Sequence, residues 1–447
     1  MKVVIVLFSL LASQLYSCLG LVPIQCKDPD VGGTTQNRDR KFMVLGSEGA
    51  GGAGLGNILI FYPAAFYFAA FTGRDIIIMD HSIIGEMCQI VNCGFPFVSQ
   101  VKLAFPNILT DEALRTIEDV KAGDFQGYVE GSRQITSPVV RSAGYISKSD
   151  WWVYFNTTVH CVKRITGCDL ADVMCAERHA YQRLIRGPFK AGLTASEEQR
   201  IHGVPDNLKH AILTLPHAYA PRLDAAVHLR AQFNHFEQQA SIDDPNYKQE
   251  VWDFLNGTES KSVFAVLEDR IIDLVNAAYE TKLADAKKVA KNIAAAKADQ
   301  PLVVEPVYIF VAADNEDVKT HFCNKLLANP ALKDKLKIMK VETKGVFHAK
   351  NMARLKDATQ NDGLLDLVFD WYALSLANNV LAWRKGGTSM VSTFVHSAQK
   401  VSGTIDRTNN HDGKGIGTRG YQLIRTKNGG LRFDFFWAYD FLEDYKI

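Results

Sequence analysis

Short apolar runs alternate with helical patterns along this chain, in two successive sets. In the first set, a strand pattern at 42–46 leads into a glycine-rich loop, an apolar helix at about 57–71 and a second strand that ends at Asp80. The second set begins near Leu223, and after a long amphipathic helix it continues with a strand pattern at 307–313. This alternation is typical of parallel sheets covered by helices. The sequence therefore predicts an α/β fold with two doubly wound, Rossmann-like domains.

The same pattern predicts the domain boundaries. The N-terminal domain is expected over 38–218 and the C-terminal domain over 222–404, with the proline-containing stretch at 213–222 as the linker. In the remaining tail, 405–447, the turn residues Asn428-Gly429-Gly430 lie between alternating apolar residues, which predicts a β-hairpin.

The first 20 residues are typical of a secretory signal. Lys2 precedes an apolar run from Val3 to Ala12, and small residues follow at Cys18 and Gly20. A cleaved signal peptide and an uncleaved signal-anchor both fit this pattern. Both place the body of the chain in the lumen of the secretory pathway, either anchored in the Golgi as a type II protein or secreted. The glycosylation sequons at Asn156 and Asn256 agree with that compartment.

Seven cysteines remain after residue 20. Disulfides are expected in an oxidising lumen, and an odd number leaves at least one cysteine without an intramolecular partner. Three of them, Cys161, Cys168 and Cys175, recur every seven residues, which would place them on one face of a continuous helix. No CxxC pair is present, so we expect no metal site.

Charge composition narrows the possible partners. The chain has 50 Lys and Arg residues against 49 Asp and Glu residues, a formal net charge of +1. Nucleic-acid-binding proteins usually carry a clear basic excess, so no nucleic acid partner is expected.

The glycine-rich loop is the first candidate binding motif. Residues 49–54 satisfy G-x-G-x-x-G after a strand, and Asp80 ends the next strand, as in dinucleotide-binding folds. Three interpretations stay open: a nicotinamide or flavin site, a structural turn, and a site for another phosphate- or sugar-bearing ligand.

Three further motifs lie in the second half. His228 and Arg230 end its first strand, two residues apart and therefore on the same side. Asp314 follows a second strand, where its carboxylate either binds a nucleoside or caps the helix that starts near Glu316. Small hydroxyl residues at the start of a later helix could bind phosphate with their backbone amides; the segment contains Ser389, Ser392, Thr393 and Phe394.

Taken together, the four motifs resemble the GDP-fucose-dependent fucosyltransferases of GT-B architecture, which include plant xyloglucan, core and protein O-fucosyltransferases. The family's Gly-x-Gly-Asn loop matches Gly54-Leu55-Gly56-Asn57, and its H-x-R strand end matches His228 and Arg230. Its third block matches Asp370–Asn378 followed by Ser392-Thr393-Phe394. The segment Trp383–Gly387 before Ser389 departs from the family pattern.

The resemblance implies an inverting, metal-independent glycosyltransferase that moves L-fucose from GDP-fucose to a glycan or glycoprotein acceptor and uses no separate cofactor. Arg230 would stabilise the departing GDP together with the segment from Ser389 to Phe394, while His228 would hold the ribose or diphosphate and Asp314 the nucleoside. The loop Gly54–Asn57, with Leu55 and Gly56, would approach the fucose and the diphosphate. Glu48 in the glycine loop is the candidate general base.

Two other functions stay open at this point. One is a non-catalytic glycan-binding protein on a degenerate GT-B fold. The other is an NAD-type oxidoreductase that uses the G-x-G-x-x-G loop.

Overall fold

The computed structural model of the protein divides into two compact units between Arg186 and Gly187. The structure describes residues 26–29, 40–46, 55–120, 124–129, 133–142, 155–168, 173–190, 198–217, 219–231, 233, 244–294, 302–342, 359–385, 393–402, 419–426, 428 and 430–436.

This division falls earlier than the linker expected at 213–222. The reason is strand β7 (Ile201–His202), which pairs antiparallel with β10 (Leu336–Val341) and so belongs to the sheet of the second unit. A two-residue strand gives no alternating pattern in the sequence, so the expectation that residues up to 218 belong to the N-terminal domain was wrong for this segment.

The first unit is built on a four-stranded parallel sheet in the order β2-β1-β5-β4. Its central strand β1 (Phe42–Leu45) is completely apolar and buried, as the sequence predicts, and pairs with β2 (Asp75–Ile78) and β5 (Val139–Ser142). The remaining elements of the unit are α2 (Leu55–Thr72), α3 (Ile83–Ile90), β3 (Val91–Cys93), α4 (Val98–Lys102), α5 (Asp111–Arg115), β4 (Glu118–Val120), α6 (Asp124–Val129), α8 (Phe155–Thr166) and α9 (Val173–Leu184). Strand β6 (Ile185–Phe189) spans the division between the units.

Helix α2 is the helix expected after the glycine loop. It ends where the sequence predicts, because Gly73 has a φ of +68° and the Arg74 N–H donates to the Ala69 carbonyl at 2.8 Å, as in a Schellman cap. Arg74 itself is 1% exposed. Its guanidinium donates to the carbonyls of Phe42, Ile135 and Pro138, which fixes the amino ends of β1 and β5.

Three disulfides hold the first unit together: Cys26–Cys161, Cys88–Cys93 and Cys168–Cys175. The seven-residue spacing does not reflect one helix, because α8 ends at Thr166 and α9 begins at Val173. Cys168 and Cys175 instead bridge the break between the two helices. Among the described cysteines, the unpaired one is Cys323, which is buried in the second unit.

The second unit contains a seven-stranded sheet in the order β13-β12-β11-β8-β9-β10-β7. The five central strands, β12 through β10 in this order, are parallel, and the two edge strands are antiparallel. From one side of the sheet to the other, the parallel strands are β10, β9, β8, β11 and β12. Along the chain, these are the third, second, first, fourth and fifth parallel strands of the unit. This is the Rossmann order, and its direction reverses between β8 (Ala225–Arg230) and β11 (Asn379–Arg384).

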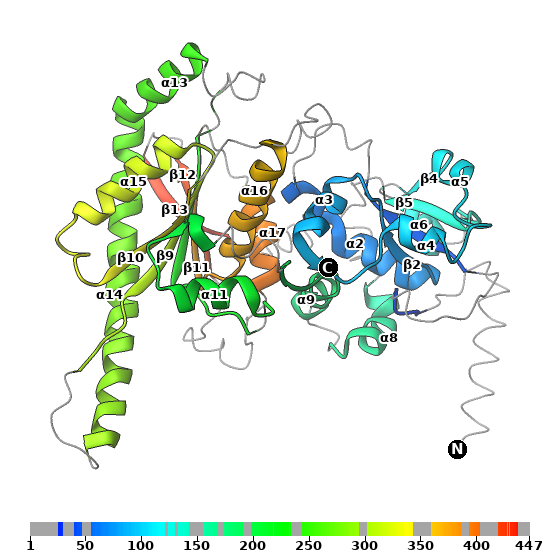
Figure 1. Ribbon diagram of the computed structural model, residues 1–447, viewed down its shortest axis with the longest axis horizontal. Helices are drawn as coiled ribbons and strands as arrows, with labels where there is room; N and C mark the ends of the chain where they lie inside the picture. The colour runs from blue at the N-terminus through cyan, green and yellow to red at the C-terminus, as the bar shows by residue number, and fades with distance from the viewer. Residues whose placement is uncertain are drawn as a thin grey trace. The chain divides into compact units, whose positions relative to one another are not determined.

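Helices cover both faces of this sheet (Figure 1). On one face, alternate residues of β8, including Val227 and Leu229, pack in a core with α13, α14 and α15. On the other face, Phe310 of β9 packs on Phe369 of α16, with ring centroids 6.1 Å apart. The unit is therefore doubly wound, as the sequence predicts. Its elements, besides β7, β8, β10 and β11, are α11 (Asp206–Thr214), α13 (Pro245–Asn256), α14 (Thr258–Ala294), β9 (Val307–Ala313), α15 (Glu316–Ala328), α16 (Thr359–Ser375), α17 (Thr393–Ser402), β12 (Arg419–Arg425) and β13 (Leu431–Phe436).

The expected C-terminal hairpin is present, and it completes the second sheet. Strands β12 and β13 pair antiparallel, and β12 pairs in parallel with β11. In the part of the chain that the structure describes, no helix has the length and apolar character needed to cross a bilayer.

Candidate functional site

The carboxyl ends of β8, β9 and β11 meet at one edge of the second sheet, next to the amino end of α17. In open α/β sheets, ligands bind outside this edge, at the point where the strand order reverses. Here that point lies between β8 and β11. Of the predicted site residues, the structure brings His228, Arg230, Asp314 and Phe394 to this edge.

His228 is a buried, neutral imidazole. Its side chain is 7% exposed, and its ring lies 5.6 Å from the Phe394 ring of α17, measured between centroids. Burial, together with the charge of Arg230, lowers the pKa of His228 to about 3. Its Nδ1 has no hydrogen-bond partner among the described residues. Near neutral pH, His228 can therefore exchange hydrogen bonds with a ligand but does not form an ion pair with it.

Arg230 is the last residue of β8 and is half-buried. Its guanidinium is close enough to His228 to lower the pKa of that imidazole. The backbone carbonyl of Arg230 is fixed, because it accepts a hydrogen bond from the Lys385 N–H at 2.9 Å. A guanidinium stays charged at every physiological pH and can bind phosphate oxygens in pairs, so this strand end presents a permanent cation.

Asp314 does not cap the helix that follows it. The N-cap of α15 is Asn315, whose side chain accepts from the Val318 N–H at 2.9 Å. Asp314 instead reaches across to the neighbouring strand end, where its Oδ1 accepts from the Ala231 N–H at 2.9 Å. It thereby fixes the backbone directly after Arg230. The nucleoside-binding role stays a prediction.

The start of α17 belongs to the same edge. Thr393 is the first residue of this helix, and the side chain of Thr393 lies outside the described part of the structure. Phe394 packs against His228, which ties the start of α17 to β8. Ser389 and Ser392 lie outside the described residues.

The residues predicted in the glycine loop lie in the first unit. Leu55 and Gly56 are buried in the first turn of α2, and Asn57 follows in the same turn, although its side chain is not described. Glu48 and Gly54 lie outside the described residues, as does the whole G-x-G-x-x-G segment at 49–54.

Asp80, which completes the dinucleotide-like pattern, has a local partner. Its carboxylate accepts hydrogen bonds from the Ser99 N–H, at 3.1 Å, and from the Ser99 hydroxyl. Ser99 is in the first turn of α4, so Asp80 acts at a helix start. This arrangement explains an acidic residue at the end of β2 without a bound nicotinamide nucleotide.

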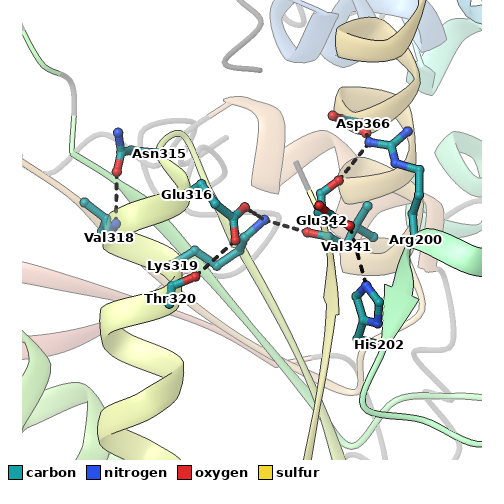
Figure 2. Close-up of polar contacts among 10 residues, drawn as sticks. All are labelled: Arg200, His202, Asn315, Glu316, Val318, Lys319, Thr320, Val341, Glu342 and Asp366. Atoms are coloured by element: carbon teal, nitrogen blue, oxygen red, sulfur yellow. Dashed lines mark hydrogen bonds and ion pairs between the residues drawn. The ribbon is translucent and has the colours of Figure 1, made fainter. Parts of the chain in front are cut away.

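A buried polar cluster that the sequence did not predict lies beside the carboxyl end of β10 (Figure 2). Lys319 of α15 is 1% exposed; its Nζ donates to the Val341 carbonyl at 2.7 Å and lies 2.6 Å from Glu316 Oε2. Arg200 pairs with Asp366 of α16, and its guanidinium also donates to the Glu342 carbonyl at 2.9 Å. Glu316 and Lys319 are three residues apart on α15, but Arg200 and Asp366 are far from them in sequence, so no motif signals the cluster.

A further carboxyl group, Asp370, interacts electrostatically with this cluster and has a raised pKa. Burial raises this pKa to about 7; Lys319 and Arg200 oppose the shift, and Asp366 and Glu316 add to it. Within the described residues, no group of three or more His, Cys, Asp or Glu side chains converges in a way that would hold a metal ion.

Comparison with known proteins gives only distant structural likenesses. No family model and no curated protein matches the chain. Among solved structures, it is similar to a mutant of Arabidopsis thaliana FUT1 in complex with GDP, at 12% identity over 88% of this chain and 73% of that one, with a TM-score of 0.41. It is also similar to NodZ α-1,6-fucosyltransferase soaked with GDP-fucose, at 12% identity over 89% of this chain and 99% of that one, with a TM-score of 0.38. For NodZ from Bradyrhizobium, the identity is 13% and the TM-score is 0.30. Structural similarities with TM-scores this low are not evidence for the activity of this chain.

Proposed function

We propose that this protein is a glycosyltransferase that moves L-fucose from GDP-fucose to a glycan or glycoprotein acceptor, with inversion at the anomeric carbon and without a metal ion. The nucleotide diphosphate binds at the carboxyl edge of the second sheet. The choice of GDP-fucose as the donor comes from the resemblance of the four sequence motifs to fucosyltransferases.

The observation that carries this proposal is the pairing of His228 with Arg230 where the strand order reverses. A buried nitrogen without a partner is unfavourable by about 1–3 kcal/mol, so the Nδ1 of His228 favours a ligand that supplies one. The adjacent guanidinium supplies the charge that an anionic ligand needs. Together the two groups suit a diphosphate with a neighbouring hydroxyl, as a nucleotide sugar has.

The chemistry follows from that placement. When the bond between the anomeric carbon and the β-phosphate oxygen breaks, its electron pair stays on the oxygen, and GDP leaves with added negative charge. Arg230 and the backbone amides at the start of α17 stabilise this charge. The acceptor oxygen attacks the anomeric carbon from the opposite side and gives its proton to a general base. Glu48 stays the proposed base.

Calorimetry with GDP tests the proposal. We expect the wild-type protein to prefer GDP to UDP and ADP, and the substitution Arg230→Ala to lower the affinity for GDP about tenfold or more, as expected when a charge-assisted hydrogen bond is lost. Arg425→Ala is the matched control, because Arg425 ends β12, a parallel strand of the same sheet that is separated from β8 by β11, and lies 3.5 Å from Glu259. If the wild-type protein shows no preference for GDP, the donor assignment fails.

A turnover assay separates an enzyme from a glycan-binding protein. With GDP-fucose and a mixture of glycoprotein acceptors, the transferase releases GDP in proportion to fucosylated product. A protein that binds glycan and releases no GDP would support the non-catalytic alternative. The proposed site of action is the lumen of the secretory pathway, with the first 20 residues as a signal peptide or membrane anchor.

A further inference from the structure

A second arginine lies opposite Arg230 in the sheet. The parallel register of β8 and β11 places Arg384 directly beside Arg230, and Ala382 beside His228. Both arginines are the last residues of their strands, and both are half-buried. The two strand ends are joined there by the hydrogen bond from the Lys385 N–H to the Arg230 carbonyl.

Arg384 belongs to the same face of the sheet as His228. Leu229 of β8 and Trp383 of β11 both pack in the core with α13 and α14. Successive residues of a strand lie on opposite faces of the sheet, so Arg230 and Arg384 both lie on the other face. The next residue, Lys385, goes to the first face: its Nζ lies 5.3 Å from the Phe233 ring and 3.8 Å from Glu250. The side chain that can join Arg230 is therefore Arg384.

Two cations in this position favour an anion. Neighbouring strands lie about 4.8 Å apart, so the two side chains start from adjacent positions. Each guanidinium can bind one anionic group through a pair of hydrogen bonds, so the pair suits a ligand with two linked anionic groups.

We infer that Arg384 is a second diphosphate-binding residue, which with Arg230 distinguishes nucleoside diphosphates from nucleoside monophosphates. This inference rests on the proposed nucleotide site of the second unit, but it does not depend on guanine or fucose being the base and the sugar. Arg384 belongs to the segment Trp383–Gly387, which departs from the fucosyltransferase pattern.

The test compares GDP with GMP. For each protein, calorimetry gives the two dissociation constants, and the measured quantity is their ratio. We expect Arg384→Gln to lower the affinity for GDP about tenfold or more and to leave the affinity for GMP nearly unchanged, so that the ratio collapses. Arg384→Lys keeps the charge but loses the planar guanidinium. We expect its ratio of dissociation constants to lie between those of the wild type and Arg384→Gln. Arg425→Gln, at the end of the adjacent strand, should match the wild type.

Each outcome bears on the inference. If the wild type binds GDP and both Arg384 variants keep its ratio, the inference is overturned and the proposed function stands. If the wild type prefers UDP, and Arg384→Gln weakens UDP but not UMP, the proposed donor fails and the role of Arg384 stands. If no nucleoside diphosphate binds, both fail. Should Arg384→Gln not fold by circular dichroism, the ratio for Arg384→Lys decides.

Discussion

The Tyr181 hydroxyl donates a hydrogen bond of 2.8 Å to the Leu59 carbonyl, the acceptor that Pro63 leaves without a helical donor. In α2, the N–H of residue 63 would normally bond to the carbonyl of residue 59, but proline has no N–H. Tyr181 lies on α9, so the proline in α2 is compensated by a side chain from another helix of the same unit. This hydrogen bond holds the helix that follows the glycine loop.

A double-mutant cycle measures this compensation. Tyr181→Phe should lower the free energy of unfolding by about 1–3 kcal/mol, because it leaves a buried carbonyl without a donor. In a Pro63→Ala background, the new N–H supplies that donor, so the same substitution should have a much smaller effect. Urea unfolding of the four proteins gives the coupling energy. An equal effect of Tyr181→Phe in both backgrounds would contradict this account.

Substitutions at Asp314 separate its two possible roles. Asp314→Asn keeps an oxygen that can accept from the Ala231 N–H, so we expect the melting temperature to stay close to that of the wild type. If the carboxylate also binds the nucleoside, as predicted, this variant should lose about tenfold in affinity for GDP.

Asn315→Ala is the control for local stability at the same loop. It removes the N-cap of α15 and should lower the free energy of unfolding by about 1 kcal/mol without a comparable loss of GDP affinity. An Asp314→Asn protein that binds GDP as the wild type does would leave Asp314 as a positioning residue for the backbone after Arg230.

The raised pKa of Asp370 predicts a pH dependence of stability. Its pKa is about 7 in the folded protein and about 4 in an unfolded chain, so the folded state binds more protons between these values. The stability from Asp370 is therefore fully present below about pH 4 and is lost as the pH rises through 7, with a slope of at most about 1.4 kcal/mol per pH unit.

Asp370→Asn should flatten this part of the curve. Chemical denaturation at several values between pH 4 and pH 7.5 measures the slope, and Asp285→Asn, at an exposed position of α14, serves as the control that should keep it. The same slope in wild type and Asp370→Asn would show that other groups set the pH dependence.

His228 should stay neutral during ligand binding. Its folded pKa of about 3 lies below its unfolded value near 6.5, so the stability linked to this group is present above pH 6.5 and is lost as the pH falls toward 3. The nitrogen chemical shifts of its imidazole, followed by NMR, should not titrate between pH 5 and pH 8. A midpoint inside that range would mean that the ring is charged near Arg230 and would remove its role as a neutral hydrogen-bonding group.

The sequence alone determined the class of fold and the places where strands end. Strands such as β1 and β9 are continuous apolar runs, helices such as α2 and α14 carry long helical patterns, and the hairpin of β12 and β13 has its turn residues. These signals are local, because burial and turn geometry act over a few residues. For the same reason, the sequence could place His228 and Arg230 at the end of a strand, two residues apart on one side.

The tertiary structure decided which distant residues meet. Arg384 joins Arg230 only because β11 pairs with β8, a register set by packing on both faces of the sheet. The cluster of Lys319, Arg200 and Asp366 likewise depends on long-range contacts, as do the disulfide partners and the pairing of β7 with β10. Asp314 contacts the backbone after Arg230 and does not cap α15, because the Ala231 N–H, which follows another strand, lies within hydrogen-bond distance of its carboxylate. Local patterns contain no information about such partners, because a hydrogen bond or ion pair depends on distance in space and not on separation along the chain.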